Sequence, residues 1–313
     1  MSKQVQSERP VIAVVGPTAS GKSDLGIALA LRAGGEVVNC DSVQVYREIE
    51  IATAKVPFEE RRGVPHHLID FVPPERNYTA ADWARDALAA IDDIEARGRT
   101  AVLVGGTGFY LRALREPFFE APPTDEALRR RLVALREQRG PEHLHALLRR
   151  LDPVRAARLR PRDWSRVQRA LELRLQTGAR ISERLADRPA PPPQAARLWV
   201  FVLNPPRAEL YRRIDLRAEA HFRAGLVEEV RALLARGVPA DSSALGAHGY
   251  RRVVEYLRGE RTLESAVAQT KLDVRHYAKR QLTWFRREPG VEWVEGFGDD
   301  REVQEEVARR LGL

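Results

Sequence analysis

The chain of 313 residues has one cysteine, Cys40, and only five lysines against 47 arginines. A single cysteine excludes a disulfide within the chain and fits a reducing compartment, so we expect the cytoplasm. The seven histidines form no Cys-x-x-Cys or His-Glu-x-x-His pattern, which leaves a zinc site without support. No apolar run approaches 18 residues, and Met1–Pro10 lacks the apolar core of a secretory signal. We therefore expect neither a membrane span nor a leader.

The net charge of +8 is unevenly distributed. Residues 115–196 contain 18 arginines, 11 acidic residues and no lysine, and residues 271–287 add a further net charge of +5. Because arginine outnumbers lysine everywhere, arginine preference alone says little, and any one basic helix can be a solvated face. Two separate basic stretches favour a polyanionic partner, with RNA or DNA first. The sequence indicates no obligate protein partner.

Residues 16–23 read Gly-Pro-Thr-Ala-Ser-Gly-Lys-Ser, a complete G-x-x-x-x-G-K-[ST] motif. The apolar run Val11–Val15 precedes it and a helical pattern follows, which is the context that a phosphate loop requires. The alternative is a Gly/Ser-rich turn. We predict a di- or triphosphate site in which Lys22 contacts phosphate oxygens and Ser23 binds Mg²⁺. The predicted phosphate-binding residues are Gly16, Pro17, Thr18, Ala19, Ser20, Gly21, Lys22 and Ser23.

Alternating strand and helix patterns predict an α/β fold with a parallel sheet, of the P-loop NTPase-like type. The predicted strands are Val11–Val15, Glu36–Cys40, His67–Phe71, Thr100–Val104, Leu198–Leu203 and Val291–Val294. The predicted helices of this core are Lys22–Ala33, Thr79–Arg97, Arg207–Arg236, Tyr250–Arg258 and Thr262–Arg286.

The strand signal vanishes for about eighty residues after Leu114, where helical spacing takes over. Helices are predicted at Thr124–Arg139, Pro141–Leu151 and Arg162–Thr177, and the proline-rich residues 188–193 then form a stiff connector. We therefore predict three segments: the first part of the core at 1–114, an inserted all-helical domain at 115–196, and the second part of the core at 197–313.

An acidic residue is missing where a nucleotide-hydrolysing enzyme would need it. Such enzymes usually carry an acid at the end of a second strand to organise Mg²⁺ and water, but the strand ending at Val104 leads into Gly105-Gly106-Thr107-Gly108. The acid is instead Asp41, at the carboxyl end of the strand Glu36–Cys40, where ligands of open α/β sheets bind. Its carboxylate can hold Mg²⁺ through water or accept a proton from a nucleophile. The alternative is a turn or helix-cap residue.

Seven segments in chain order resemble the tRNA dimethylallyltransferase (IPP transferase) family. The strings Asp-Ser-x-x-x-Tyr, Thr-Ala-Lys and Lys-Arg-Gln-x-Thr-Trp are together highly specific, whereas the phosphate loop alone is not. Ala52, Val56 and His248 depart from the family pattern beside motifs rather than at reactive positions. The segments are Gly16–Ser23, Asp41–Tyr46, Ile51–Lys55, Val64–Asp70, Gly105–Tyr110, Arg166–Glu172 and Tyr277–Arg286.

The resemblance implies transfer of a dimethylallyl group from dimethylallyl diphosphate to N6 of adenosine 37, beside the anticodon of tRNA, with release of pyrophosphate. It implies that Asp41 is the general base, that Thr107 contacts the substrate or pyrophosphate, and that Lys22 stabilises the leaving group. A P-loop small-molecule kinase and a P-loop RNA-binding or remodelling protein are the alternatives.

The resemblance also implies a set of contacts to the anticodon stem-loop. The segment Tyr277–Arg286 can equally pack against the core, so both packing and contact with tRNA remain open for it. The implied tRNA-binding residues are Asp41, Ser42, Val43, Gln44, Thr107, Arg129, Ser165, Arg166, Val167, Gln168, Arg169, Lys279, Arg280, Gln281, Thr283 and Arg286.

Overall fold

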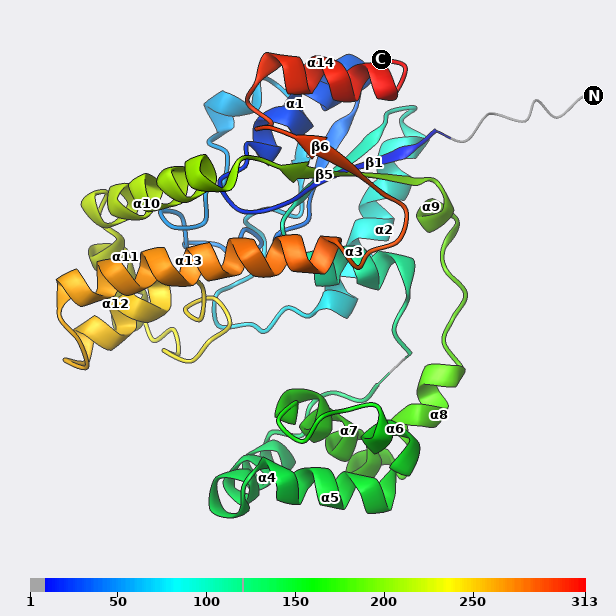
Figure 1. Cartoon of the computed structure of the whole chain (residues 1–313), viewed down its shortest axis with the longest axis vertical. Coiled ribbons are helices and arrows are strands. Elements are labelled where there is room, and N and C mark those ends of the chain that lie inside the picture. Colours follow the sequence, from blue (N-terminus) through cyan, green and yellow to red (C-terminus); the bar gives the residue numbers. More distant parts are fainter. Residues whose placement is uncertain (1–8, 120) are drawn as a thin grey trace, which may run out of the picture. The chain divides into compact units, whose positions relative to one another are not determined.

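The computed structural model describes residues 9–119 and 121–313, which form two compact units (Figure 1). The first unit runs to Arg115 and resumes with Pro192–Leu313, and the second is Glu116–Pro191. The predicted insertion, 115–196, extends further at its end than the second unit. Its last residues, Pro193–Ala196, form the short helix α9 that leads into the sheet of the first unit. Residues 1–8 of the predicted core and Glu120 of the predicted insertion lie outside the described residues.

A six-stranded parallel sheet with the order β3-β2-β4-β1-β5-β6 forms the centre of the first unit. The predicted α/β class is therefore confirmed. Residues in the central strands are buried on both faces, as expected for parallel strands covered by helices. The five strands that match prediction within two residues are β1 (Val11–Val15), β2 (Glu36–Asn39), β4 (Ala101–Gly105), β5 (Leu198–Asn204) and β6 (Val291–Glu295).

Two predicted elements are wrong in their extent. The strand predicted at His67–Phe71 is only β3 (His66–His67), because Leu68 and Asp70 adopt φ angles of 59° and 56°, which break an extended strand. The helix predicted at Arg207–Arg236 is two helices, α10 (Arg207–Arg223) and α11 (Leu226–Ala235). Gly225 separates them with a φ angle of 98°.

Helices cover both faces of the sheet (Figure 1). α1 (Lys22–Ala33) and α14 (Arg301–Arg310) contact each other on one face, and α2 (Ala80–Ala96) and α3 (Gly108–Arg115) contact each other on the opposite face. α12 (Tyr250–Leu257) and α10 both pack against the long helix α13 (Leu263–Phe285). The sequence did not predict α3 or α14. No helix among residues 9–119 and 121–313 has the length and apolar character needed to cross a membrane.

The register of the strands brings three loops to one edge of the sheet. Val15 of β1 pairs with Gly105 of β4, and Asn39 of β2 pairs with Val104. The phosphate loop, Asp41 and Thr107 therefore follow strands that end at the same level.

The second unit is a helical cluster with its own aliphatic core. Its buried side chains include Leu132, Leu144, Leu148 and Val167. The helices are α4 (Glu126–Arg139), α5 (Pro141–Leu151), α6 (Pro153–Ala157), α7 (Trp164–Thr177) and α8 (Ile181–Ala186).

Candidate active site

The phosphate loop curls between β1 and α1, and part of its backbone has positive φ angles. Ala19 has a φ angle of 66° and Gly21 one of 78°. Gly21 precedes α1 without a side-chain cap, so the first N–H groups of the helix remain available to an anion. A Cβ atom on Gly21 would lie 2.4 Å from Asp299 Oδ1, so only glycine fits this position.

Lys22 is the first residue of α1, and its side chain reaches back to the phosphate loop. Its Nζ donates a hydrogen bond to the Pro17 carbonyl at 2.6 Å, and Ser20 Oγ donates to the same oxygen at 2.8 Å. Burial lowers the pKa of Lys22 to about 8, against the raising effect of Asp41, and Arg217 lowers it further. A bound phosphate would supply the negative charge that this buried ammonium lacks.

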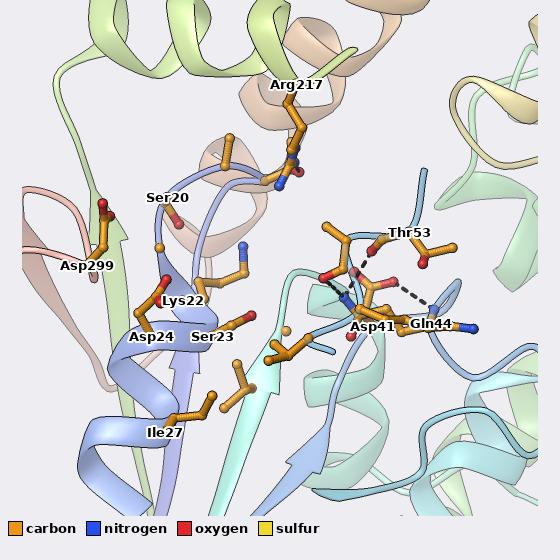
Figure 2. Close-up of a pocket in the computed structure, with 18 of the residues that line it drawn as sticks. Ser20, Lys22, Ser23, Asp24, Ile27, Asp41, Gln44, Thr53, Arg217 and Asp299 are labelled. Carbon is orange, nitrogen blue, oxygen red and sulfur yellow. Dashed lines mark hydrogen bonds between the residues drawn. The ribbon is translucent and has the colours of Figure 1, made fainter. Parts of the chain in front are cut away.

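Two neighbouring cavities meet at Asp41. The phosphate cavity, of about 440 Å³, is lined by the phosphate loop, Lys22 and Ser23. The second cavity, of about 460 Å³, is lined more by aromatic and aliphatic side chains, and Thr107 belongs to it. Six residues line both cavities: Thr18, Asp41, Thr53, Ala54, Arg217 and Tyr277. Figure 2 shows Lys22 and Asp41 on opposite sides of the phosphate cavity, with Arg217 projecting toward it from above.

Asp41 is held by its own turn. Its Oδ1 accepts hydrogen bonds from the backbone N–H groups of Val43 at 2.9 Å and Gln44 at 3.4 Å. Within the described part of the chain, Oδ2 has no hydrogen-bond donor. The turn-residue interpretation therefore accounts for one oxygen, and the other is available to a ligand.

Thr107 fixes the backbone beside Asp41. Its Oγ1 accepts a hydrogen bond from the Ser42 N–H at 3.0 Å and donates to Ser42 Oγ at 3.3 Å. Tyr277 lines both cavities beside Asp41, and burial raises the pKa of its hydroxyl, with the Asp41 charge acting in the same direction. Ser42 and Thr107 thus form a hydrogen-bonded pair next to Asp41, a connection that the sequence did not predict.

The loop Ile51–Lys55 is tied to the Asp41–Tyr46 turn. Gln44 Nε2 donates to the carbonyls of Thr53 at 3.0 Å and Ala54 at 3.1 Å. The Lys55 ammonium donates to the Tyr46 carbonyl at 2.7 Å and also pairs with Asp70. Gln44 is one of the residues predicted to contact tRNA, and its amide nitrogen is engaged within the protein.

Sequence reasoning missed Arg217. It projects from α10, donates a hydrogen bond to Thr18 Oγ1, and lines both cavities. Burial lowers its pKa, and Asp41 opposes that effect. The available signal was spacing, because Arg213, Arg217 and His221 follow each other at four-residue intervals and so share one helix face. Arg213 is engaged by Asp299, whose two oxygens each lie 2.8 Å from its Nη1.

Residues predicted on the tRNA side of α13 divide in two. Lys279, Arg280, Thr283 and Arg286 are exposed. Gln281 is buried, with 5% of its surface exposed, and it lines the phosphate cavity. Its amide oxygen accepts a hydrogen bond from the Thr18 N–H, and its amide nitrogen donates one to the Gly106 carbonyl.

The predicted contacts in the second unit divide likewise. Ser165 and Arg166 are exposed at the start of α7, whereas Val167 lies in the aliphatic core. The Gln168 Nε2 bonds the buried carboxylate of Glu172 at 3.0 Å, so a surface role for either Val167 or Gln168 is corrected. Helical periodicity explains this, since four consecutive residues cannot share one face.

Arg129 and Arg169 also bind Glu172. Arg129 Nε and Nη2 donate to the two Glu172 oxygens at 2.9 and 3.1 Å, and Arg169 Nη1 donates at 3.3 Å. The guanidinium of Arg129 therefore neutralises a buried acid, a role that the sequence did not predict.

The parallel α/β sheet and the phosphate loop that follows β1 define a P-loop protein, with the Asp41 carboxylate in the cavity of that loop. The family model described as IPP transferase matches residues 44–288. The chain is 48% identical over 302 residues to the tRNA dimethylallyltransferase of Solibacter usitatus, covering 96% of this chain and 98% of that protein. It is 47% identical to the tRNA dimethylallyltransferase of Koribacter versatilis, covering 95% and 96%.

Solved structures give the same result. The full-length tRNA isopentenylpyrophosphate transferase of Bacillus halodurans matches with a TM-score of 0.70 and 38% identity over 97% of both chains. A eukaryotic dimethylallyltransferase, crystallised acting on tRNA, matches with a TM-score of 0.80 and 28% identity over 97% of this chain and 78% of that one. The chain belongs to the IPP transferase family and is an enzyme of the tRNA dimethylallyltransferase class.

Proposed function

We propose that the chain transfers the dimethylallyl group of dimethylallyl diphosphate to N6 of adenosine 37 in tRNA and releases pyrophosphate. The observation that carries this proposal is the position of the acid. β4 lies directly beside β1, where a nucleotide-hydrolysing enzyme would place its acid, yet β4 leads into Gly106 and Thr107. Of the carboxylates that line the phosphate cavity, Asp41 is the one that also lines the more apolar second cavity.

The two cavities match the two halves of the reaction. In the phosphate cavity, the loop N–H groups, Lys22 and Arg217 hold the diphosphate and stabilise the charge that builds on it as its bond to the allylic carbon breaks. In the second cavity, the adenine amine attacks that carbon. The new bond joins N6 to the allylic carbon, the electrons of the broken carbon–oxygen bond leave with pyrophosphate, and the N6 proton passes to the free oxygen of Asp41.

Mg²⁺ fits this site through oxygen ligands. The Ser23 hydroxyl lines the phosphate cavity, and oxygen donors suit a hard cation. Among residues 9–119 and 121–313, no group of three or more His, Cys, Asp or Glu side chains gathers to hold a metal. Substrate phosphate oxygens and water must then complete the coordination of Mg²⁺, which would offset the charge of the leaving diphosphate.

An adenine in an anticodon loop must leave its stack to enter the second cavity, at a cost of a few kcal/mol. Basic contacts to the RNA backbone offset such a cost. Exposed cations suited to this lie on α13 at Lys279 and Arg280, directly after α13 at Arg286, and on α7 at Arg166. We propose that these side chains contact the anticodon stem-loop, and that the enzyme works in the cytoplasm with its tRNA substrate.

Nucleoside analysis tests the proposal directly. Unmodified tRNA, dimethylallyl diphosphate, Mg²⁺ and the full chain are incubated, and digested nucleosides are examined by mass spectrometry. The expected product is N6-dimethylallyladenosine at position 37, formed without ATP. An absolute requirement for ATP, or phosphorylation of a small molecule, would contradict the proposal and favour a small-molecule kinase.

A further inference from the structure

An exposed tryptophan begins α7 in the second unit. Trp164 keeps 45% of its surface accessible, although tryptophan is the largest apolar side chain. The core of this unit is formed by leucine, valine, alanine and isoleucine side chains. The indole therefore presents apolar surface outside that core, where exposure normally costs free energy.

One neighbour of Trp164 shapes what that surface can bind. The guanidinium of Arg136, from α4, lies over the indole with its central carbon 4.1 Å from the ring centroid. Only 21% of the Arg136 side chain is exposed, so the arginine is packed against its surroundings rather than free in solvent. A cation over one side of an aromatic ring is attracted to that ring, so Arg136 restrains the orientation of the indole.

The surroundings of the indole carry positive charge. Arg162 and Arg166 are exposed on either side of Trp164 in the sequence. Residues 116–191 contain 17 arginines and 11 acidic residues, a net charge of +6. A flat aromatic surface among cations matches an unpaired nucleic-acid base, whose ring stacks while its phosphates meet the arginines.

We propose that Trp164 is a stacking platform for an unpaired base of the RNA substrate, held in place by Arg136. The proposal deepens the proposed function, because it rests on RNA being the substrate. It differs from the contacts predicted for residues 165–169, because stacking depends on an unpaired base, whereas ionic contacts depend on the charge of the RNA backbone.

Comparing the affinities for two RNAs separates the contribution of base stacking from that of backbone charge. The probes are an anticodon hairpin with its unpaired loop and a fully paired duplex with the same number of phosphates. Affinity is measured by fluorescence anisotropy at one salt concentration, with the full chain. Trp164→Ala should weaken hairpin binding about 5- to 150-fold, the loss expected of one stacked base, and leave duplex binding unchanged. Trp164→Phe should retain most of the affinity.

Leu175→Ala is the matched control, because Leu175 lies on the same helix and is 49% exposed. It should bind both RNAs like the parent. Hairpin binding by Trp164→Ala within twofold of the parent would overturn the proposal. So would an equal loss on hairpin and duplex, which would indicate a role in backbone contact, or a lowered melting temperature of the free variant, which would indicate a role in packing.

The binding experiment is also independent of catalysis. If the parent binds the hairpin more tightly than the duplex but forms no modified adenosine, the proposed reaction fails while the stacking result still counts. If Trp164→Ala modifies tRNA at the parent's kcat under saturating RNA, its defect lies in binding, as stacking requires.

Discussion

Gln281 accepts a hydrogen bond from the Thr18 N–H at 2.9 Å, which joins α13 to the phosphate loop across 263 positions of sequence. Its Nε2 donates to the Gly106 carbonyl, also at 2.9 Å. A Cβ atom on Gly106 would lie 2.0 Å from that nitrogen, so the contact requires glycine there. One buried amide thus connects the loops that follow β1 and β4.

Replacing Gln281 should therefore affect both stability and diphosphate binding. Gln281→Leu leaves the Thr18 N–H and the Gly106 carbonyl without this partner, which should lower the free energy of unfolding by about 2–4 kcal/mol. The Kd for dimethylallyl diphosphate should rise, because the phosphate loop loses its support. Urea denaturation and calorimetry measure the two effects. Lys279→Leu, two residues earlier and exposed, is the control, and an equal loss in that variant would remove the special role of Gln281.

The pKa of Lys22 predicts how diphosphate binding depends on pH. With a pKa of about 8, free Lys22 loses its proton between pH 7 and pH 9.5, so binding must return a proton to it at the upper end. The Kd for the diphosphate should rise through this range, where phosphate groups are already ionised. Titration calorimetry at several pH values should show this rise in the parent and not in Lys22→Met. A parent Kd independent of pH would contradict it.

The same lysine predicts a pH dependence of stability. Its pKa is about 8 in the folded chain, against 10.5 for a lysine exposed to water, so between these values the unfolded chain binds more protons. The contribution of Lys22 to the free energy of unfolding should therefore rise as the pH increases from 8 to 10.5. Comparing urea denaturation of the parent and Lys22→Met across this range isolates that contribution, and parallel curves would argue against it.

The fold was predictable where strand and helix patterns are local. Val11–Val15 and Ala101–Gly105 are continuous apolar runs, and burial on both faces makes them so. The prediction of a strand at His67–Phe71 was wrong because Leu68 and Asp70 adopt left-handed backbone angles. The residue types leucine and aspartate do not indicate such angles. Gly225, which divides α10 from α11, was visible in the sequence but does not by itself reveal a helix end.

The site was predictable where one loop or turn contains it. The phosphate loop and the Asp41 turn are each contiguous, so motif and chemistry coincide. Arg217 and Gln281 reach the site from helices far along the chain, and only the tertiary fold brings them to Thr18. The burial of Val167 and Gln168 was not predictable either, because both belong to a basic segment, and a high charge indicates exposure to solvent.

Asp41 offers a substitution that separates chemistry from structure. Asp41→Asn keeps a side-chain oxygen that can accept from the Val43 and Gln44 N–H groups, so the turn should persist. It removes the base, so kcat should fall by about 10²–10⁴ while the Kd for dimethylallyl diphosphate stays unchanged. Single-turnover assays with saturating tRNA measure the chemical step. Turnover within threefold of the parent would exclude Asp41 as the base.

Salt dependence distinguishes the two kinds of arginine in the second unit. If tRNA binding neutralises several phosphates, log Kd should change linearly with log salt, by roughly 0.7–0.9 for each phosphate. Arg166 keeps 68% of its side chain exposed, and its ion pair with Asp163 lies near the surface. Arg166→Ala should therefore flatten the slope by about one unit.

Arg129→Ala should act on stability instead. Its guanidinium offsets the charge of Glu172, whose side chain is 1% exposed, so the variant leaves that carboxylate with Arg169 and Gln168 alone. The free energy of unfolding should fall, by up to about 3 kcal/mol, because a buried charge loses one partner. Adding Glu172→Gln should recover part of that loss, since it removes the charge that Arg129 balanced. An Arg129→Ala variant that keeps the parent's stability and flattens the salt slope would show that Arg129 contacts phosphate after all.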